Sequence, residues 1–226
     1  MHVTALAFHL AGVRVVFTTG SLPLAALAVI VGMICAPAAG LPIWGGALLG
    51  LGTMASLIAH ELGHAAAARR LGLPIGELRV FLLGAGLHLG AAPPTALGAA
   101  ILSGAGPATN LLLAVLFAAL INVSPIAALA TGLVVVNLAL AALNLVPLYP
   151  ADGGKLVAAA LRGLGISTRG AVIAAQLLTV PLAAGLAIGG LSLLWHSSPT
   201  GALLFASQWV FLGVSAAQSL LTAAKV

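Results

Sequence analysis

Residues 42–70 read PIWGGALLGLGTMASLIAHELGHAAAARR, a run of apolar and small residues that carries two histidines and a glutamate before the two arginines at its end. The run is longer than the about 20 residues that a transmembrane helix needs. Within it, His60 and His64 are four residues apart and so share one helix face, which Glu61 flanks. A carboxylate near the centre of a bilayer costs about 2.5–3.5 kcal/mol even on the most lenient insertion scale. Side chains this costly indicate a function.

The chain as a whole has the composition of an integral membrane protein. Of its 226 residues, 62% are hydrophobic and 5% are charged, and the mean hydropathy of +1.24 is far above the range of soluble proteins. Eight basic residues stand against three acidic ones. In a soluble domain this excess would suggest nucleic acid, but here the basic residues stand at the ends of apolar runs, where they anchor spans. The expected surroundings are a lipid bilayer, and nucleic-acid binding is excluded.

Apolar segments of suitable length predict six transmembrane helices. They cover residues 19–38, 42–70, 95–121, 124–145, 168–193 and 200–222. In this arrangement all eight basic residues fall on one side of the membrane, and the opposite connections carry neither Lys nor Arg. The positive-inside rule identifies the basic side as the cytoplasm. We therefore expect a multi-pass protein with both termini in the cytoplasm.

Two stretches are too irregular for helices and predict β-structure. Residues 2–17 read as two short apolar strands around Gly12, and residues 75–90 alternate apolar with small residues. The predicted fold class is an all-α membrane protein of about six helices with short strands at its cytoplasmic face. Because no internal repeat and no linker interrupts the chain, residues 1–226 are expected to form one membrane domain.

The histidine pair predicts a metal site. Both imidazoles of His60-Glu61-x-x-His64 can reach one ion, and Glu61 is placed to act on a water bound to that ion rather than as a ligand. Two nitrogen ligands with a neighbouring general base are typical of zinc peptidases. The alternative is that the pattern arises by chance, but three polar groups in an apolar span would then need another reason to be there.

A catalytic zinc ion needs a third protein ligand and one open position. Asp152, in the sequence YPADGG over residues 149–154, is the natural candidate, because Glu77 is the only other acidic residue available. The alternative role for Asp152 is the N-cap of a short helix predicted over residues 155–163. Taken together with the histidine pair, Asp152 is favoured as a ligand. We expect one Zn²⁺ per chain, bound by His60, His64 and Asp152.

Three motifs of the chain resemble those of the site-2 proteases, a family of intramembrane zinc metalloproteases. They are His60-Glu61-x-x-His64, Gly106-Pro107-x-x-Asn110 and Asn144-x-x-Pro147-x-x-Pro150-x-Asp152-Gly153-Gly154. The resemblance implies a three-span catalytic core within about residues 42–164, flanked by the first, fifth and sixth spans. It further implies a prokaryotic cell membrane and cleavage of peptide bonds within or near the transmembrane helices of other proteins, as in regulated intramembrane proteolysis. A chain of 226 residues leaves no room for the PDZ or CBS domains of many relatives.

Further roles follow for a few polar and small residues. Glu61 is the expected general base, and the amide of Asn144 is a candidate donor to the oxyanion, although a helix-bridging role is equally compatible with its position. Asn110 is a candidate substrate contact, with helix packing as its alternative. Gly84 and Gly86 are candidate substrate contacts on a strand edge that could pair with an extended peptide.

Other functions were weighed against intramembrane proteolysis. A metal-ion transporter also places His and Asp in spans, but its ligands are usually spread over several spans with two-fold internal symmetry. A different membrane zinc peptidase, such as a prenyl-protein endopeptidase, would not be expected to carry the Pro-spaced motif that ends in Asp152. An inactive relative that only binds other proteins is disfavoured because every expected chemical group is present.

Overall fold

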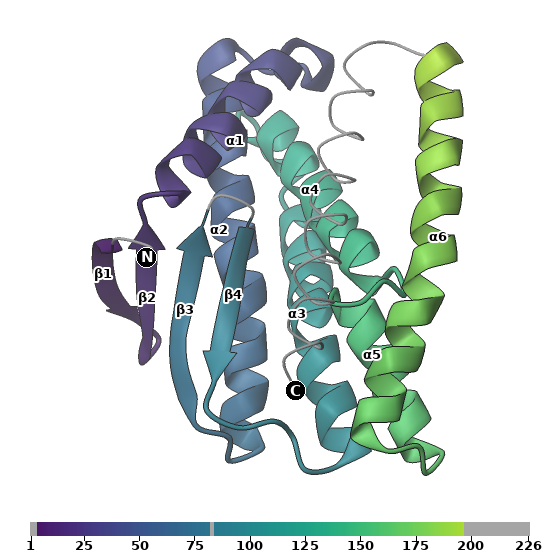
Figure 1. The fold of residues 1–226 in the computed structure, drawn as a ribbon. Helices are drawn as coiled ribbons and strands as arrows, with labels where there is room; N and C mark the ends of the chain where they lie inside the picture. Colours follow the sequence, from purple (N-terminus) through teal and green to yellow (C-terminus); the bar gives the residue numbers. More distant parts are fainter. Residues whose placement is uncertain (1–3, 82–83, 197–226) are drawn as a thin grey trace. The chain divides into compact units, whose positions relative to one another are not determined.

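The computed structural model describes residues 4–81 and 84–196, and the chain divides after Asn144 into two compact units (Figure 1). The first unit holds a small sheet and most of the helices, and the second begins at Leu145. The described chain is mostly helical, as predicted.

Helices occupy five of the six segments that the sequence predicts as spans. They are α1 (Ser21–Cys35), α2 (Ile43–Arg70), α3 (Ala96–Ala118), α4 (Ala127–Leu145) and α6 (Thr168–His196), with a 3₁₀ turn, η1 (Pro37–Ala39), after α1. Among the described residues, α2, α3 and α4 are long and apolar enough to cross a membrane, whereas α1 has only 15 residues. The sixth predicted span, residues 200–222, lies outside the described part of the chain.

The predicted strands form one four-stranded sheet. They are β1 (Thr4–Leu10), β2 (Val13–Thr18), β3 (Ile75–Phe81) and β4 (Gly84–Leu89), in the order β1-β2-β3-β4. The pairs β1/β2 and β3/β4 are antiparallel, and β2 runs parallel to β3. Leu78 on β3 stands opposite Leu87 on β4. As the last strand in this order, β4 has a neighbour in the described sheet on one side only.

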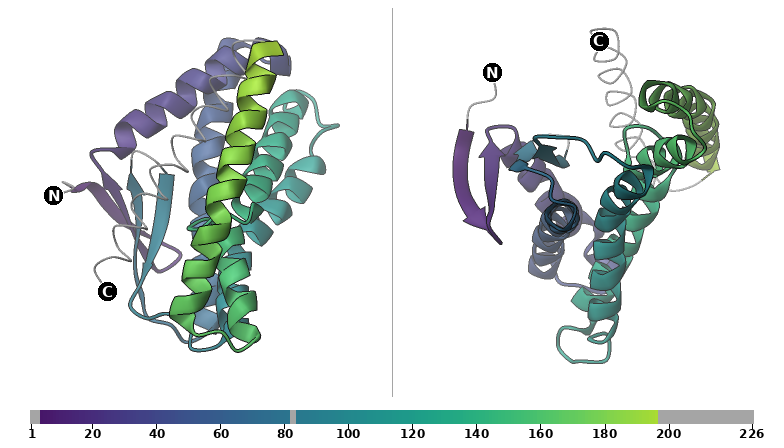
Figure 2. Two further views of the ribbon diagram at one scale, coloured as in Figure 1. Left: turned by 45° about the vertical axis from the view of Figure 1, so that its right-hand side comes forward. Right: turned by 90° about the horizontal axis from the view of Figure 1, so that it is seen from below.

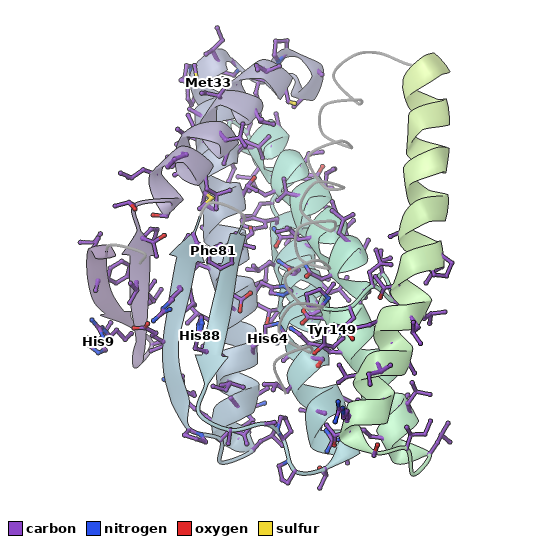
Figure 3. All side chains as sticks on the ribbon, in the orientation of Figure 1. His9, Met33, His64, Phe81, His88 and Tyr149 are labelled. Atoms are coloured by element: carbon purple, nitrogen blue, oxygen red, sulfur yellow. The ribbon has the colours of Figure 1, made fainter. Side chains whose placement is uncertain are left out.

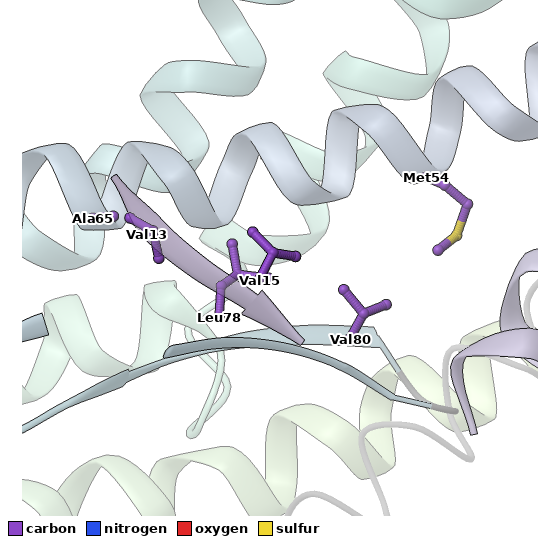
Figure 4. Packing of buried hydrophobic residues seen from close by; sticks show 6 residues of the cluster. All are labelled: Val13, Val15, Met54, Ala65, Leu78 and Val80. Atoms are coloured by element: carbon purple, nitrogen blue, oxygen red, sulfur yellow. The ribbon is translucent and has the colours of Figure 1, made fainter. Parts of the chain in front are cut away.

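A small apolar core joins the sheet to α2. Val13, Val15, Leu78 and Val80 are two residues apart on neighbouring strands, so they point to the same face. They are almost fully buried with Met54 and Ala65 of α2 (Figure 4). The views in Figures 1 and 2 show the sheet along one side of α2 with α3 on the other side. This core holds β3 and β4 beside the half of α2 that carries the histidines.

Close packing of α1 on α2 depends on glycine. A Cβ atom at Gly46 or Gly50 of α2 would overlap backbone atoms of α1, and one at Gly32 of α1 would overlap backbone atoms of α2. Small residues let helices approach in this way where lipid offers no hydrophobic drive to associate. These three glycines therefore set how closely α1 and α2 approach.

The second unit contains α5 (Asp152–Gly163) and α6. Small side chains of the two helices, Ala158 on α5 with Ala171 and Ala175 on α6, form their buried contact. In the segment before α5, the backbone N–H of Tyr149 donates to Thr179 Oγ1 at 2.8 Å, which fastens that segment to α6. The short helix predicted over residues 155–163 is therefore present and begins three residues earlier.

Candidate metal centre

His60 and His64 lie on one face of α2 and point toward each other. Both are buried, with 3% and 8% of their surfaces exposed, and their Nε2 atoms are 3.2 Å apart. Figure 3 labels His64 on this helix. The helical spacing of four residues predicts this pairing, and the structure confirms it.

The other ring nitrogen of each histidine is bonded to an oxygen that can only accept. His60 Nδ1 lies 2.6 Å from Asn110 Oδ1, and His64 Nδ1 lies 2.7 Å from the backbone carbonyl of Leu102. An amide or peptide oxygen has no proton to give, so each Nδ1 carries the hydrogen and donates it. Each neutral ring then has a lone pair on Nε2. The two Nε2 atoms are close enough to bind one ion.

This geometry fits two ligands of a zinc ion. Zn–N bonds of about 2.0–2.1 Å at a tetrahedral angle separate two ligand nitrogens by about 3.3 Å. The observed Nε2 to Nε2 distance of 3.2 Å agrees with that value. Histidine ligands also usually donate their second N–H to a carbonyl or similar acceptor, as both do here.

One stripe of α3 serves both histidines. Leu102, Gly106 and Asn110 are spaced by four residues, so they lie along one face of the helix. The first accepts from His64, the third accepts from His60, and the second lies between them. A Cβ atom built on Gly106 would overlap Nε2 of both rings. Gly106 therefore keeps open the space that the two lone pairs face.

The carboxylate of Glu61 is buried and is held by the sheet. The backbone N–H of Leu87 on β4 donates to Glu61 Oε2 at 2.9 Å. The core described above places β4 beside this half of α2, which makes the bond possible. The sequence predicted Glu61 beside the histidines, but nothing in the sequence signalled its backbone donor.

In the second unit, Asp152 is buried as the first residue of α5. The N-cap of that helix is Ala151, and no side chain caps it, so the alternative N-cap role for Asp152 is wrong. A carboxylate in the first helical turn is favoured by the positive end of the helix dipole. Lys155 Nζ lies 3.3 Å from Asp152 Oδ1.

The two glycines after Asp152 explain the shape of its motif. A Cβ atom at Gly153 would overlap the carbonyl oxygens of Leu145 and Val146, and one at Gly154 would overlap the backbone near Tyr149. The chain before α5 therefore folds directly against the first turn of the helix. Only glycine permits that approach, which fixes the backbone that carries the aspartate.

The remaining predicted site residues lie as follows. Asn144 is half-buried near the end of α4, and its amide donates to Leu140 O at 2.9 Å on its own helix. Asn110 is fully buried, with both ends of its side chain bonded. Gly84 and Gly86 are on β4, opposite Phe81 and Arg79 of β3. Their roles in substrate binding and chemistry stay predictions.

Two further polar residues of this region are not predicted by any sequence motif. Ser56 and Asn137 are buried beside Asn110, where α2, α3 and α4 meet. Their polarity within apolar spans could have identified them, since polar residues in such spans usually have a structural or functional role. The sequence places Gly106 in one of the three motifs but does not indicate that it lies against the two histidines.

Known proteins provide two similarities. The chain is 34% identical over 165 residues to a protein of Mycobacterium tuberculosis, strains Erdman and H37Rv, whose name is "Putative zinc metalloprotease Rip3"; the match covers 65% of this chain and 41% of that protein. A site-2 protease from Methanocaldococcus jannaschii has the same fold, with a TM-score of 0.68 over 94% of both chains at 21% identity. No protein-family model matches the chain.

The chain therefore has the fold of that site-2 protease. It spans about two fifths of the length of the mycobacterial relatives that it matches. The metalloprotease activity in the relatives' name belongs to those longer proteins.

Filling the space at Gly106 should abolish zinc binding. In Gly106→Ala the added methyl group occupies the position that both Nε2 atoms face, so the two rings can no longer share an ion. Zinc affinity, measured by competition with a chelator, should fall below detection. Gly104→Ala is the matched control, since a Cβ atom there has nothing within 4 Å. Unchanged zinc affinity in Gly106→Ala would contradict this description of the space.

Proposed function

We propose that this protein is an intramembrane zinc metalloprotease that hydrolyses peptide bonds within or near the transmembrane helices of other membrane proteins. The observation that carries this proposal is the pair of Nε2 lone pairs 3.2 Å apart on an apolar helix, beside a buried glutamate. Metal coordination, a general base and a membrane-embedded position are the three requirements of that activity. The metalloprotease name of the mycobacterial relative agrees with it.

We infer that His60, His64 and Asp152 bind one zinc ion per chain. All three are buried, and each offers one ligand atom. Two imidazole nitrogens and one carboxylate oxygen are a typical donor set for catalytic zinc, which leaves a fourth position open. A bound zinc ion would supply an activated water and polarise the carbonyl of the scissile bond.

Glu61 and Asn144 carry the remaining chemistry in this proposal. Glu61 takes a proton from the attacking water and returns it to the leaving amine, so the bond between carbonyl carbon and nitrogen is replaced by a carboxylate and an amine. The Asn144 amide has two N–H groups, of which one donates to Leu140 O. An amide donor of this kind stabilises the oxyanion that forms on the scissile carbonyl.

The substrate binds as an extended strand along β4. The peptide groups of a transmembrane helix are hydrogen-bonded within the helix, so the helix must unwind before cleavage. The edge of a strand can then form hydrogen bonds with the released peptide groups. Residues of an antiparallel strand alternate between bonding their partner and facing away from it. The N–H of Leu87 points away from β3, because it donates to Glu61. The backbone groups of Ala85 and Leu89, two residues to either side, point in the same direction. These residues, rather than Gly84 and Gly86, offer backbone groups to the substrate.

We further propose six spans in a prokaryotic cell membrane, with both termini in the cytoplasm. Arg69 and Arg70 end α2 and are exposed, as expected at a cytoplasmic boundary. His64 and His60 lie six and ten residues before Arg70, which is ~9–15 Å at about 1.5 Å per residue. The metal centre would therefore lie in the cytoplasmic half of the bilayer.

Replacing Glu61 should separate zinc binding from catalysis. We expect Glu61→Gln to retain zinc and to lose hydrolysis of a single-span substrate, because an amide cannot take up the proton. Metal content and product formation in proteoliposomes measure the two effects. Glu77→Gln is the matched control: that glutamate lies on β3 and pairs with Arg14 and Arg79. Turnover by Glu61→Gln close to that of the unchanged protein would exclude Glu61 as the base.

Asn144→Ala should slow turnover about 10²-fold with zinc retained, which is the usual loss for one oxyanion donor. The effect should appear in kcat, since the donor acts on charge that develops in the transition state. Thr131→Ala is a control on the same helix, where the hydroxyl bonds only its own backbone, at Ala127 O. An unchanged rate would leave Asn144 with a role in helix packing.

A further inference from the structure

Three buried polar side chains meet where α2, α3 and α4 contact one another. Asn110 and Asn137 are fully buried, and Ser56 is 3% exposed. In an apolar helix bundle each such group must find a partner, because burying an amide without a hydrogen bond is unfavourable. Their hydrogen bonds join the three helices and also reach His60.

The hydrogen bonds all donate in one direction, from His60 through Asn110 to Asn137 and the backbone of α4. Asn137 Nδ2 donates to Leu133 O at 2.9 Å and to Ser56 Oγ at 3.0 Å. Asn110 Nδ2 donates to Asn137 Oδ1 at 3.0 Å and to Ser56 O at 3.4 Å. Asn110 Oδ1 then accepts from His60 Nδ1 at 2.6 Å. Both amides have their oxygen and both N–H groups engaged.

The backbone carbonyls that accept from the two amides fix the direction of these hydrogen bonds. Leu133 O can only accept, so Asn137 must turn its NH₂ group toward it and its oxygen toward Asn110. Asn110 must then present its own NH₂ group to that oxygen, which leaves its oxygen facing His60. His60 Nδ1 must carry the proton, and its lone pair is confined to Nε2. The tautomer of His60 is therefore determined through two amide side chains, by Leu133 O on α4 together with Ser56 O on α2.

We propose that Asn137 is a positioning residue for the metal site, acting on His60 through Asn110. The proposal rests on the proposed zinc function and concerns a residue outside all three motifs. The hydrogen bonds of Asn137 go to Leu133, Ser56 and Asn110, so it acts on His60 through its neighbour. Groups that orient zinc ligands typically contribute about 10–100-fold to metal affinity.

The same bonds assign Asn110 to orientation rather than to substrate contact. Its side chain has no exposed surface, and its three hydrogen-bonding functions are directed to His60, Asn137 and Ser56. A substrate would have to break this set of bonds to reach the amide.

A double-mutant cycle on zinc affinity tests the proposal. Zinc Kd is measured by chelator competition on the purified full chain, for Asn110→Leu, Asn137→Leu and the double variant. Each single variant should raise Kd about 10–100-fold. The double variant should be no weaker than Asn110→Leu alone, because Asn137 acts only through Asn110.

Two threonines provide matched controls. Thr109→Val lies next to Asn110 on α3, where the hydroxyl donates to Ala105 O, and Thr131→Val lies on α4. Both change a polar group that is satisfied by its own helix, so zinc Kd should stay unchanged. Asn137→Ser is the milder variant should Asn137→Leu fail to fold. Its hydroxyl can bond Leu133 O but is too short to orient Asn110, so Kd should still rise.

Two results would overturn the proposal. One is an unchanged zinc Kd in Asn137→Leu or Asn137→Ser, even with a lower melting temperature, since Asn137 would then only join the helices. The other is an additive loss in the double variant, which would mean that the two residues act separately. The variant His60→Ala separates failure of this proposal from failure of the proposed zinc function. If His60→Ala leaves the zinc Kd unchanged, His60 is not a ligand and the zinc site itself is refuted.

Discussion

The Nε2 atoms of His60 and His64 lie 3.2 Å apart beside one shared position, and the rest of the site is arranged around this pair. A cation at that position could bind both nitrogens. The arrangement persists because each ring is fixed from behind, by Leu102 O and by Asn110 Oδ1. The structure holds two donors ready for a metal at the spacing that zinc requires.

Each of the candidate chemical groups has its own support in the fold. A stripe of α3 orients both rings and keeps the space before them open at Gly106. The sheet, anchored to α2 by a small apolar core, offers a backbone N–H to Glu61. In the second unit, two glycines let the backbone fold against α5 and so fix Asp152. The chemical groups are few, and most of the surrounding sequence serves to hold them.

Local patterns in the sequence predict the elements better than the contacts between them. Apolar runs and the spacing of His60 and His64 locate the helices and the histidine face, and alternation with glycine locates the strands. The bond from Leu87 to Glu61 depends on how strands distant in sequence pair and pack, which no local pattern contains. Asn137 is 77 residues from His60, and its link to the site exists only through the packing of three helices.

The metal content of the purified chain tests whether His60, His64 and Asp152 hold one zinc ion. We expect about one zinc per chain, as for a single catalytic site. We expect none when the three residues are replaced together by Ala in a protein that remains folded. Zinc that remains bound to the folded triple variant at the same stoichiometry would contradict this assignment.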